Sequence, residues 1–316
     1  INMDIAEIVK GENFFQRLQG GQFPHAILFQ SIDKRLNEVA LIMTALSINY
    51  KTFELFDENS AEYLKVKKGA DIDIKIYPKN NEKLLVSDSN EIVSEVYIKP
   101  AFHENKVFII ENLDISTEQA QNKLLKVLEE PPKNVYFLIS CMEDTLVLPT
   151  IKSRCQKIVL EKLPKEKFDA LIKNPLAGMI SEGYIGLYEE YSKKSNLEEV
   201  VDMAIKLVTD LKNSGQVLKF SSDLMRFKDD MCLIFKIYIL CLEDLIKIKT
   251  EKEELCALPL YMDALKSVES EFSINAICEI SSLVSMFMKK REANVNEQVA
   301  VEQLLLKILE VKYICK

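Results

Sequence analysis

The sequence lacks cysteines arranged for metal binding or for a disulfide framework. Its seven cysteines are an odd number, none belongs to a Cys-x-x-Cys motif, and neither histidine lies near one of them. Cysteines within apolar helical patterns, here Cys232, Cys241 and Cys278, behave as small hydrophobic residues when they stay reduced. We therefore expect free thiols, no structural zinc and a cytoplasmic protein.

A long hydrophobic run and an excess of positive charge are also missing. The most apolar run, 231–242, is interrupted by Lys236 and is shorter than the ~20 residues that span a bilayer. Residues 1–5 lack the basic start and apolar core of a secretory signal. A net charge of −8 and a pI near 5.2 argue against a surface that captures nucleic acid by itself. We expect no membrane role, and any DNA contact to be shared with partners.

The chain has enough apolar residues, 48% of 316, to bury the cores of more than one domain. Residues 1–160 alternate between short β-branched or aromatic runs and helical stretches, which is typical of an α/β domain with a largely parallel sheet. Strand patterns end after Leu163-Pro164. We therefore predict an α/β domain at 1–160, a small helical domain at 161–212 and a larger helical domain at 213–316.

Within the α/β domain, apolar runs predict strands that are buried on both faces, and a strictly alternating run predicts a half-exposed strand. The buried strands are expected at 25–29, 106–110 and 135–139, the half-exposed strand at 71–77, and helices at 36–46 and 117–130. For the second helix, Ser116 and Gln119 suggest a capping box, and Pro131-Pro132 end it. Its apolar face should lie in the core; it comprises Ala120, Leu124, Leu125 and Leu128.

Three segments in order carry a resemblance to a known family: 106–114 (KVFIIENLD), 122–132 (NKLLKVLEEPP) and 148–156 (LPTIKSRCQ). Together they closely resemble the clamp-loader branch of the AAA+ superfamily. With His25-Ala26 before the first strand and Asn294-Val295-Asn296 near the end of the sequence, the chain is similar to the delta-prime family of the bacterial DNA polymerase III clamp loader.

The resemblance implies an AAA+ module, a parallel sheet flanked by helices with a small helical lid, followed by an all-α collar that joins subunits into a ring. Such rings use ATP to open a sliding clamp and place it on primed DNA. The implied partners are ATPase motor subunits and a clamp-opening subunit, with primed DNA and the clamp contacted through the complex. The chain would then be an accessory subunit of the polymerase holoenzyme, and not an enzyme by itself.

The expected nucleotide site is degenerate. A P-loop follows G-x-x-x-x-G-K-[ST], because glycines let backbone N–H groups approach the phosphates while the Lys and the hydroxyl bind phosphate and magnesium. No glycine occurs between 22 and 68. An ungapped alignment from His25 places Ser31 and Leu36 at the glycine positions, Asn37 at the lysine and Glu38 at the hydroxyl.

The second half of that site is altered as well. Glu111 and Asn112 follow the strand where active relatives carry an Asp-Glu pair, and an amide cannot act as a base. We predict no ATP hydrolysis and no cofactor, although Lys34 or Arg35 remain candidates for weak phosphate binding. The family often carries a four-cysteine zinc module; residues 49–69 contain no cysteine, so we predict no zinc.

In clamp loaders, the arginine of the Ser153-Arg154-Cys155 motif resembles a finger that reaches the γ-phosphate held by a neighbouring subunit. The motif follows a strand and a turn, so we place Arg154 at the start of an element leaving the sheet. Ser153 should orient the turn and Cys155 should pack. For Arg154 the alternative is a surface salt bridge. For 129–132 we expect a helix end, with shaping of a subunit contact as the alternative.

Three functions remain open from the sequence. The first is a noncatalytic clamp-loader subunit that donates Arg154. The second is an active clamp-loader ATPase, which the missing P-loop residues disfavour. The third is a helical scaffold in another complex. His25 and His103 have no catalytic or metal-binding companion at useful spacing, so we expect both to be structural.

Overall fold

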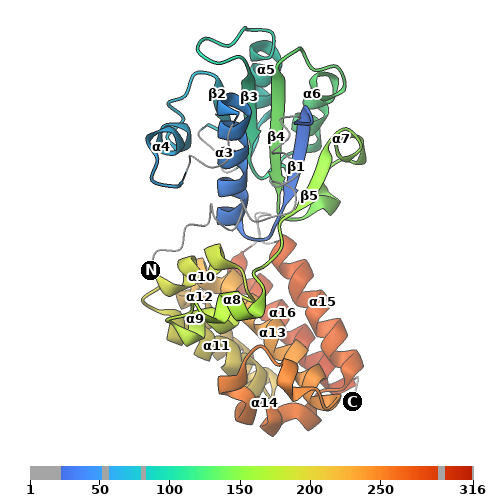
Figure 1. Cartoon of the computed structure of the whole chain (residues 1–316). Coiled ribbons are helices and arrows are strands. Elements are labelled where there is room, and N and C mark those ends of the chain that lie inside the picture. The colour runs from blue at the N-terminus through green and yellow to red at the C-terminus, as the bar shows by residue number, and fades with distance from the viewer. Residues whose placement is uncertain (1–22, 52–56, 80–82, 291–295, 315–316) are drawn as a thin grey trace. The chain divides into compact units, whose positions relative to one another are not determined.

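The computed structural model describes residues 23–51, 57–79, 83–290 and 296–314. The chain divides into two compact units, whose elements are shown in Figure 1. Unit 1 comprises Ile1–Leu171 with Gly183–Leu187, and unit 2 comprises Ile172–Glu182 with Tyr188–Lys316. All strands that the structure describes lie in unit 1, and the described part of unit 2 is helical. The predicted fold class is therefore confirmed.

Unit 1 is built around a parallel sheet of five strands in the order β2-β3-β4-β1-β5. The strands are β1 (Ala26–Gln30), β2 (Ile74–Tyr77), β3 (Lys106–Ile110), β4 (Val135–Cys141) and β5 (Gln156–Val159). Parallel neighbours need crossover connections, so helices alternate with the strands along the chain. Because every strand runs in the same direction, their carboxyl ends share one edge of the sheet and their amino ends share the other.

Helices cover both faces of this sheet. They are α3 (Lys34–Tyr50), α4 (Ala61–Lys67), α5 (Val86–Glu95), α6 (Glu118–Glu129) and α7 (Pro149–Lys152). Unit 1 also contains the short helix α8 (Lys165–Asp169). α3 packs against β1, β3 and β4, whose residues Ile27, Ile109 and Leu138 are buried. Alternate strand residues point to the opposite face and form a core with α5, α6 and α7.

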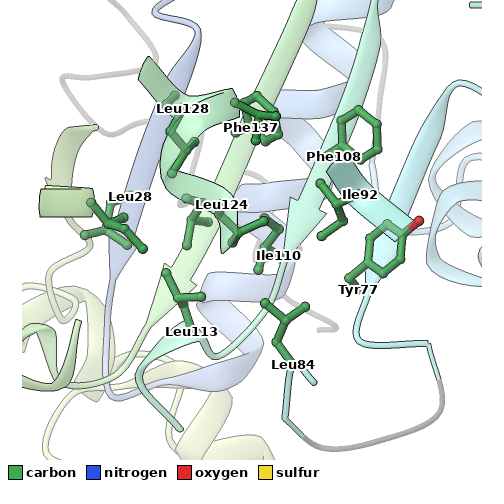
Figure 2. Packing of buried hydrophobic residues seen from close by; sticks show 14 of the residues in the cluster. Leu28, Tyr77, Leu84, Ile92, Phe108, Ile110, Leu113, Leu124, Leu128 and Phe137 are labelled. Carbon is green, nitrogen blue, oxygen red and sulfur yellow. The ribbon is translucent and has the colours of Figure 1, made fainter. Parts of the chain in front are cut away.

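Aromatic side chains belong to that second core, and Figure 2 shows them beside its aliphatic residues. The rings of Tyr77 and Phe108 are stacked with centroids 6.5 Å apart, and Phe108 and Phe137 are stacked at 5.6 Å. These residues come from three adjacent strands, and Phe108 pairs with Phe137 in the β3–β4 register. The three aromatic side chains therefore pack β2, β3 and β4 against the helices on this face of the sheet.

Most predicted strands are confirmed. The strand at 106–110 matches β3, while β1 begins one residue later than predicted and β4 continues to Cys141. The predicted strand 71–77 begins only at Ile74, because the Asp71 carboxylate accepts the N–H groups of Asp73 and Ile74 and holds the preceding residues in a turn. β5 was not predicted; it is an edge strand in which Ile158 is the buried residue.

The helix over 117–130 was predicted correctly, but its cap was not. The N-cap is Thr117, whose Oγ1 accepts the N–H of Ala120 at 3.2 Å. Ser116 instead donates its hydroxyl to the carbonyl of Leu113. On the apolar face Leu125 is only partly buried, whereas its three predicted companions are fully buried. The predicted helix 36–46 corresponds to the longer α3.

Unit 2 is organised around the long apolar helix α13. Its helices are α9 (Pro175–Ile180), α10 (Ile185–Ser192, shared with unit 1), α11 (Leu197–Thr209), α12 (Val217–Arg226), α13 (Met231–Lys249), α14 (Met262–Val268), α15 (Ile274–Lys290) and α16 (Glu297–Ile314). α13 packs against α11 and α15, and Phe235 meets Phe287 edge-on at 5.4 Å. Cys241 is buried as expected, but Cys278 is exposed, so the prediction for Cys278 was wrong.

The predicted boundaries at 160 and 212 stay predictions. α11, from the segment expected to form the small helical domain, packs against α13 and α14 from the next predicted segment. Asn294-Val295-Asn296, which contributed to the resemblance, falls mainly outside the described residues. None of the described helices is long and apolar enough to cross a membrane.

Candidate functional site

The loop after β1 is too short to form a phosphate-binding loop. Only residues 31–33 separate the end of β1 from the beginning of α3. The predicted P-loop positions Leu36, Asn37 and Glu38 therefore lie inside the first turns of the helix, and Leu36 is buried. With the chain already helical at these positions, no wide loop of backbone N–H groups surrounds a phosphate-sized space.

A carboxylate of the chain itself occupies the N-terminus of α3. Asp33 is fully buried, and its Oδ1 accepts the backbone N–H groups of Arg35 and Leu36, each at 3.0 Å. Its Oδ2 accepts the N–H of Gly186 at 2.7 Å. Donors of this kind, at the positive end of a helix dipole, are those that bind phosphate in nucleotide sites. The residues present do not fit a triphosphate, because the anion position is already filled.

Asn37, at the position of the P-loop lysine, has a structural role. Its side chain is 2% exposed, and Nδ2 donates to the carbonyl of Ser31 at 2.9 Å and to that of Cys141 at 3.4 Å. Ser31, at the first glycine position, donates its own N–H to the Cys141 carbonyl at 3.2 Å. These bonds tie the loop after β1 to the end of β4.

An ion-pair network covers the first turns of α3. Arg35 pairs with Glu38 at 2.9 Å and with Glu58 at 2.6 Å, and Lys67 on α4 pairs with Glu38 at 2.7 Å. Burial tends to lower the pKa of Arg35, but the nearby carboxylates outweigh it and raise that pKa above its ordinary value. Arg35, one of the candidates for weak phosphate binding, is therefore already neutralised, whereas Lys34 is exposed.

Glu111 and Asn112 follow β3 at the same edge of the sheet. Burial, and then the charge of Glu38, raise the pKa of the Glu111 carboxyl to about 7. Asn112 adopts the left-handed conformation, with φ of 51°, and donates its N–H to Ser140 Oγ at 3.0 Å. Among the described residues, no group of three or more potential ligands is placed to hold a metal ion.

Arg154 lies between α7 and β5, at the surface of unit 1. Its Nη1 donates to the carbonyl of Thr150 at 2.8 Å and to Ser153 Oγ at 3.4 Å, and its Nη2 pairs with Glu129 at 3.1 Å. The side chain is 29% exposed. β5 then joins the sheet beside β1, so the prediction that Arg154 begins an element leaving the sheet was wrong.

Arg154 and the filled phosphate position lie at opposite edges of the sheet. The parallel register pairs Ile27 with Gln156, so Arg154, which precedes Gln156, lies beyond the amino end of β1. Its partner Glu129 ends α6, just before the amino end of β4. Asp33 follows the carboxyl end of β1. Arg154 is therefore on the wrong side of the sheet to act on the nucleotide position of its own chain.

Ser153 and Cys155, on either side of Arg154, shape the turn between α7 and β5, which we call the Arg154 corner. The hydroxyl of Ser153 donates to the carbonyl of Thr150 at 3.0 Å, which closes the last turn of α7. Burial raises the pKa of the Cys155 thiol to about 12, so this side chain stays protonated and packs against the apolar core. A protonated, buried thiol is a packing group and not a nucleophile.

Both histidines have local structural contacts, and so does Lys106 at the start of β3. His25 Nε2 lies 3.1 Å from a backbone carbonyl of α6, and the ring of His103 meets that of Tyr50 edge-on at 5.0 Å. Lys106 is 3% exposed, and its ammonium pairs with Glu95 at 2.7 Å. Its charge is satisfied inside unit 1.

Sequence reasoning missed Asp33, Lys67 and Gly186. Asp33 carries a usable signal, because an Asp directly before an apolar helical pattern is a preferred N-cap. Lys67 lies on a separate helix, and Gly186 reaches Asp33 across 153 positions of the chain. No local pattern links these residues to α3.

Comparisons with known proteins agree with the motifs. The family described as "DNA polymerase III, delta subunit" matches residues 9–164, about half of the chain. The DNA polymerase III subunit gamma of Buchnera aphidicola (subsp. Schizaphis graminum) is 28% identical over 177 residues, which cover 50% of this chain and 49% of that protein. The subunit tau of Escherichia coli is 32% identical over 100 residues, 32% of this chain and 15% of that protein.

A solved structure of a gamma-subunit-related protein from Thermotoga maritima covers 98% of this chain at 17% identity, with a TM-score of 0.48. The chain spans about half or less of the length of the two curated relatives. The region matched by the family, residues 9–164, contains all five strands, Asp33 and Arg154. On the family match and these relatives, the chain belongs to the DNA polymerase III clamp-loader family.

Proposed function

We propose that this chain is a noncatalytic, delta-prime-type subunit of the DNA polymerase III clamp loader, which donates Arg154 in trans to a nucleotide held by a neighbouring subunit. It supports ATP-driven loading of the sliding clamp onto primed DNA and is not an enzyme by itself. Its direct partners are the ATPase motor subunits and the clamp-opening subunit. Primed DNA and the clamp are contacted through the complex.

The observation that carries this proposal is the position of Arg154 relative to the sheet. It lies at the amino edge, whereas the chain's own nucleotide position lies at the carboxyl edge and is filled by Asp33. An arginine at this corner has no phosphate to bind on its own chain. A second chain that presents its nucleotide to this corner gives the side chain a target.

The contacts of Arg154 are weak enough for its guanidinium to leave Glu129 and bind a triphosphate. Its ionic partner Glu129 has a side chain that is 59% exposed, and exposed pairs contribute only about 0–1 kcal/mol. The other two acceptors are a backbone carbonyl and a hydroxyl. A triphosphate offers more negative charge and bidentate geometry, so the guanidinium loses little when it leaves Glu129.

The loss of nucleotide chemistry in this chain rests on several side chains together. Asp33 fills the anion position, Asn37 replaces the phosphate-binding lysine, and Asn112 replaces the acidic residue that would act as general base after β3. The proposal assigns neither a bound ATP nor a zinc ion to this chain itself, and residues 49–69 contain no cysteine.

The proposal is tested by Arg154→Ala in a clamp loader reconstituted with the motor and clamp-opening subunits. We expect the kcat of DNA-stimulated ATP hydrolysis to fall about 10-fold or more at the site that receives the arginine, with a smaller change in KM, because the contact forms in the transition state. Arg226→Ala is the matched control, since that side chain is 76% exposed in unit 2; it should leave the rate unchanged.

Two alternatives have distinct outcomes. The Glu129 pair is what a purely structural surface arginine would show, and an Arg154→Ala complex with the parent rate would favour a scaffold role in another complex. An active ATPase would bind nucleotide by itself. Titration of the isolated chain with fluorescent ATP should show no saturable binding, and micromolar affinity would favour that alternative.

A further inference from the structure

We propose that Asp33 is a built-in substitute for the nucleotide phosphate, which fastens residues 183–187 to the α/β domain whether or not nucleotide is present. This inference rests on the proposed function, in which the chain's own site takes no triphosphate. It concerns unit 1, because residues 183–187 belong to that unit although the residues on both sides belong to unit 2.

The Asp33 carboxylate joins the beginnings of two helices. Oδ1 accepts two N–H groups from the first turn of α3, and Oδ2 accepts the N–H of Gly186 in the first turn of α10. The carboxylate is fully buried, so all these bonds form away from water. Hydrogen bonds to a charged acceptor are about twice as strong as neutral ones, and both helix ends present the positive side of their dipoles.

The contact with Asp33 leaves no room for a side chain at position 186. A Cβ added at this position would lie 2.1 Å from Asp33 Oδ1 and 2.6 Å from the Cβ of Arg35. Neither atom has room to move away, because Asp33 is held by the backbone of α3 and Arg35 by its ion pairs. Close approach of residue 186 to the beginning of α3 therefore needs glycine at this position.

The chain makes a tight return to bring Gly186 into place. Glu182 and Gly183 both have positive φ angles, 54° and 94°, and the carbonyl of Gly183 accepts the N–H of Leu163 at 3.0 Å. Ile185 is buried beside them. The segment is thus anchored at both ends, by Leu163 at one end and by Asp33 at the other.

The consequence is a segment whose position does not depend on ATP. A diffusible phosphate at a helix N-terminus stabilises what it touches only while it is bound, so its contacts come and go with the ligand. An aspartate in the same place is covalently attached to the chain. Residues 183–187 are therefore held in one arrangement through the whole ATP cycle of the complex.

Hydrogen–deuterium exchange on the full chain tests this inference. In Asp33→Ala, the amides of residues 183–187 should exchange about 10- to 100-fold faster, the factor by which a hydrogen bond to a charged group shifts a local opening equilibrium. Gly186→Ala should have a similar effect from the other side, because its Cβ would clash with Asp33 while the aspartate itself is retained. Thr117→Ala is the matched control, since it removes an N-cap from α6 in the same unit and should leave 183–187 unchanged.

Two results would overturn the inference. One is exchange at 183–187 within about 2-fold of the parent in Gly186→Ala, while protected amides in β3 and β4 show a folded sheet. The other is slower exchange at 183–187 of the parent on addition of millimolar Mg·ATP, which would make the fastening nucleotide-dependent. The proposed function fails by a different readout, saturable ATP binding to the parent, and the two variants still decide the role of Asp33 in that case.

Discussion

Charged side chains are paired differently at the carboxyl and amino edges of the sheet in unit 1. At the carboxyl edge, Asp33, Arg35, Glu38 and Lys67 are all paired with groups of the same chain, and Asp33 is fully buried. At the amino edge, Arg154 rests on an exposed carboxylate and a backbone carbonyl. The charges at the first edge are satisfied within the chain, whereas the exposed carboxylate at the second holds its arginine only weakly.

Because of this difference, we expect the carboxyl edge to contribute to stability and the Arg154 corner to contribute to function. Substitutions at the carboxyl edge disturb buried polar groups, which are costly to leave unpaired. Substitutions at the Arg154 corner remove exposed contacts, which contribute little to folding. Two results would contradict this difference: a large loss of stability on substitution of Arg154, or nucleotide binding gained at the carboxyl edge.

The largest effect is expected from Asn37→Lys, which restores the lysine of a P-loop. The new ammonium would lie at a position that is 2% exposed and away from water, so we expect the free energy of unfolding to fall by about 2–4 kcal/mol. Urea unfolding of the full chain measures it, with Asn122→Lys on the exposed face of α6 as the control. ATP binding gained without loss of stability would contradict the claim that the groups at the carboxyl edge stabilise the fold.

A smaller, pH-dependent effect is expected at Glu111. Its folded pKa, about 7, lies above the ordinary value of 4.5, so the folded state holds a proton that the unfolded state has released. Stability is therefore lost as the pH rises from about 4.5 through 7. Glu111→Gln removes this loss and should be about 1–3 kcal/mol more stable, relative to the parent, at pH 8 than at pH 5.

Urea unfolding at the two pH values measures this difference. Glu118→Gln, an exposed carboxyl on α6, is the control and should show the same difference from the parent at both pH values. A Glu111→Gln effect that is equal at pH 5 and pH 8 would contradict a protonated carboxyl at the carboxyl edge.

The smallest effect on folding is expected at the corner itself. Arg154→Ala and Glu129→Gln should each change the free energy of unfolding by less than about 1 kcal/mol, because Glu129 is 59% exposed and solvent screens the pair. The measurement is urea unfolding at low and high salt. A loss above about 2 kcal/mol for Arg154→Ala would mean that the arginine holds the fold, and would favour the structural alternative.

The buried strands could be predicted from the sequence because their apolar runs have no other stable place than a core. Residues 106–110 are all buried in β3, and the run alone indicated it. β5 could not be predicted, since its residues are mostly exposed and only its pairing with β1 makes it a strand. The choice between Ser116 and Thr117 as N-cap was equally hidden, because both side chains can accept the same kind of bond.

The candidate site was predictable only where it repeats a motif. The missing P-loop residues and Arg154 follow from the linear sequence, and the structure describes where each of them lies. What fills the vacated phosphate position does not follow from it. Asp33 meets Gly186 through a distant turn, and Glu38 meets Lys67 through a separate helix, so these contacts exist only once unit 1 has folded.

The most direct test of the account is chemical rescue of the arginine in the assembled clamp loader. A complex that contains Arg154→Gly should hydrolyse ATP slowly in the presence of primed DNA. Guanidinium ions at low millimolar concentration should restore part of that rate, while an Arg226→Gly complex keeps the parent rate and does not respond. An Arg154→Gly complex with the parent rate before any guanidinium is added would contradict the claim that this side chain completes a neighbour's triphosphate site.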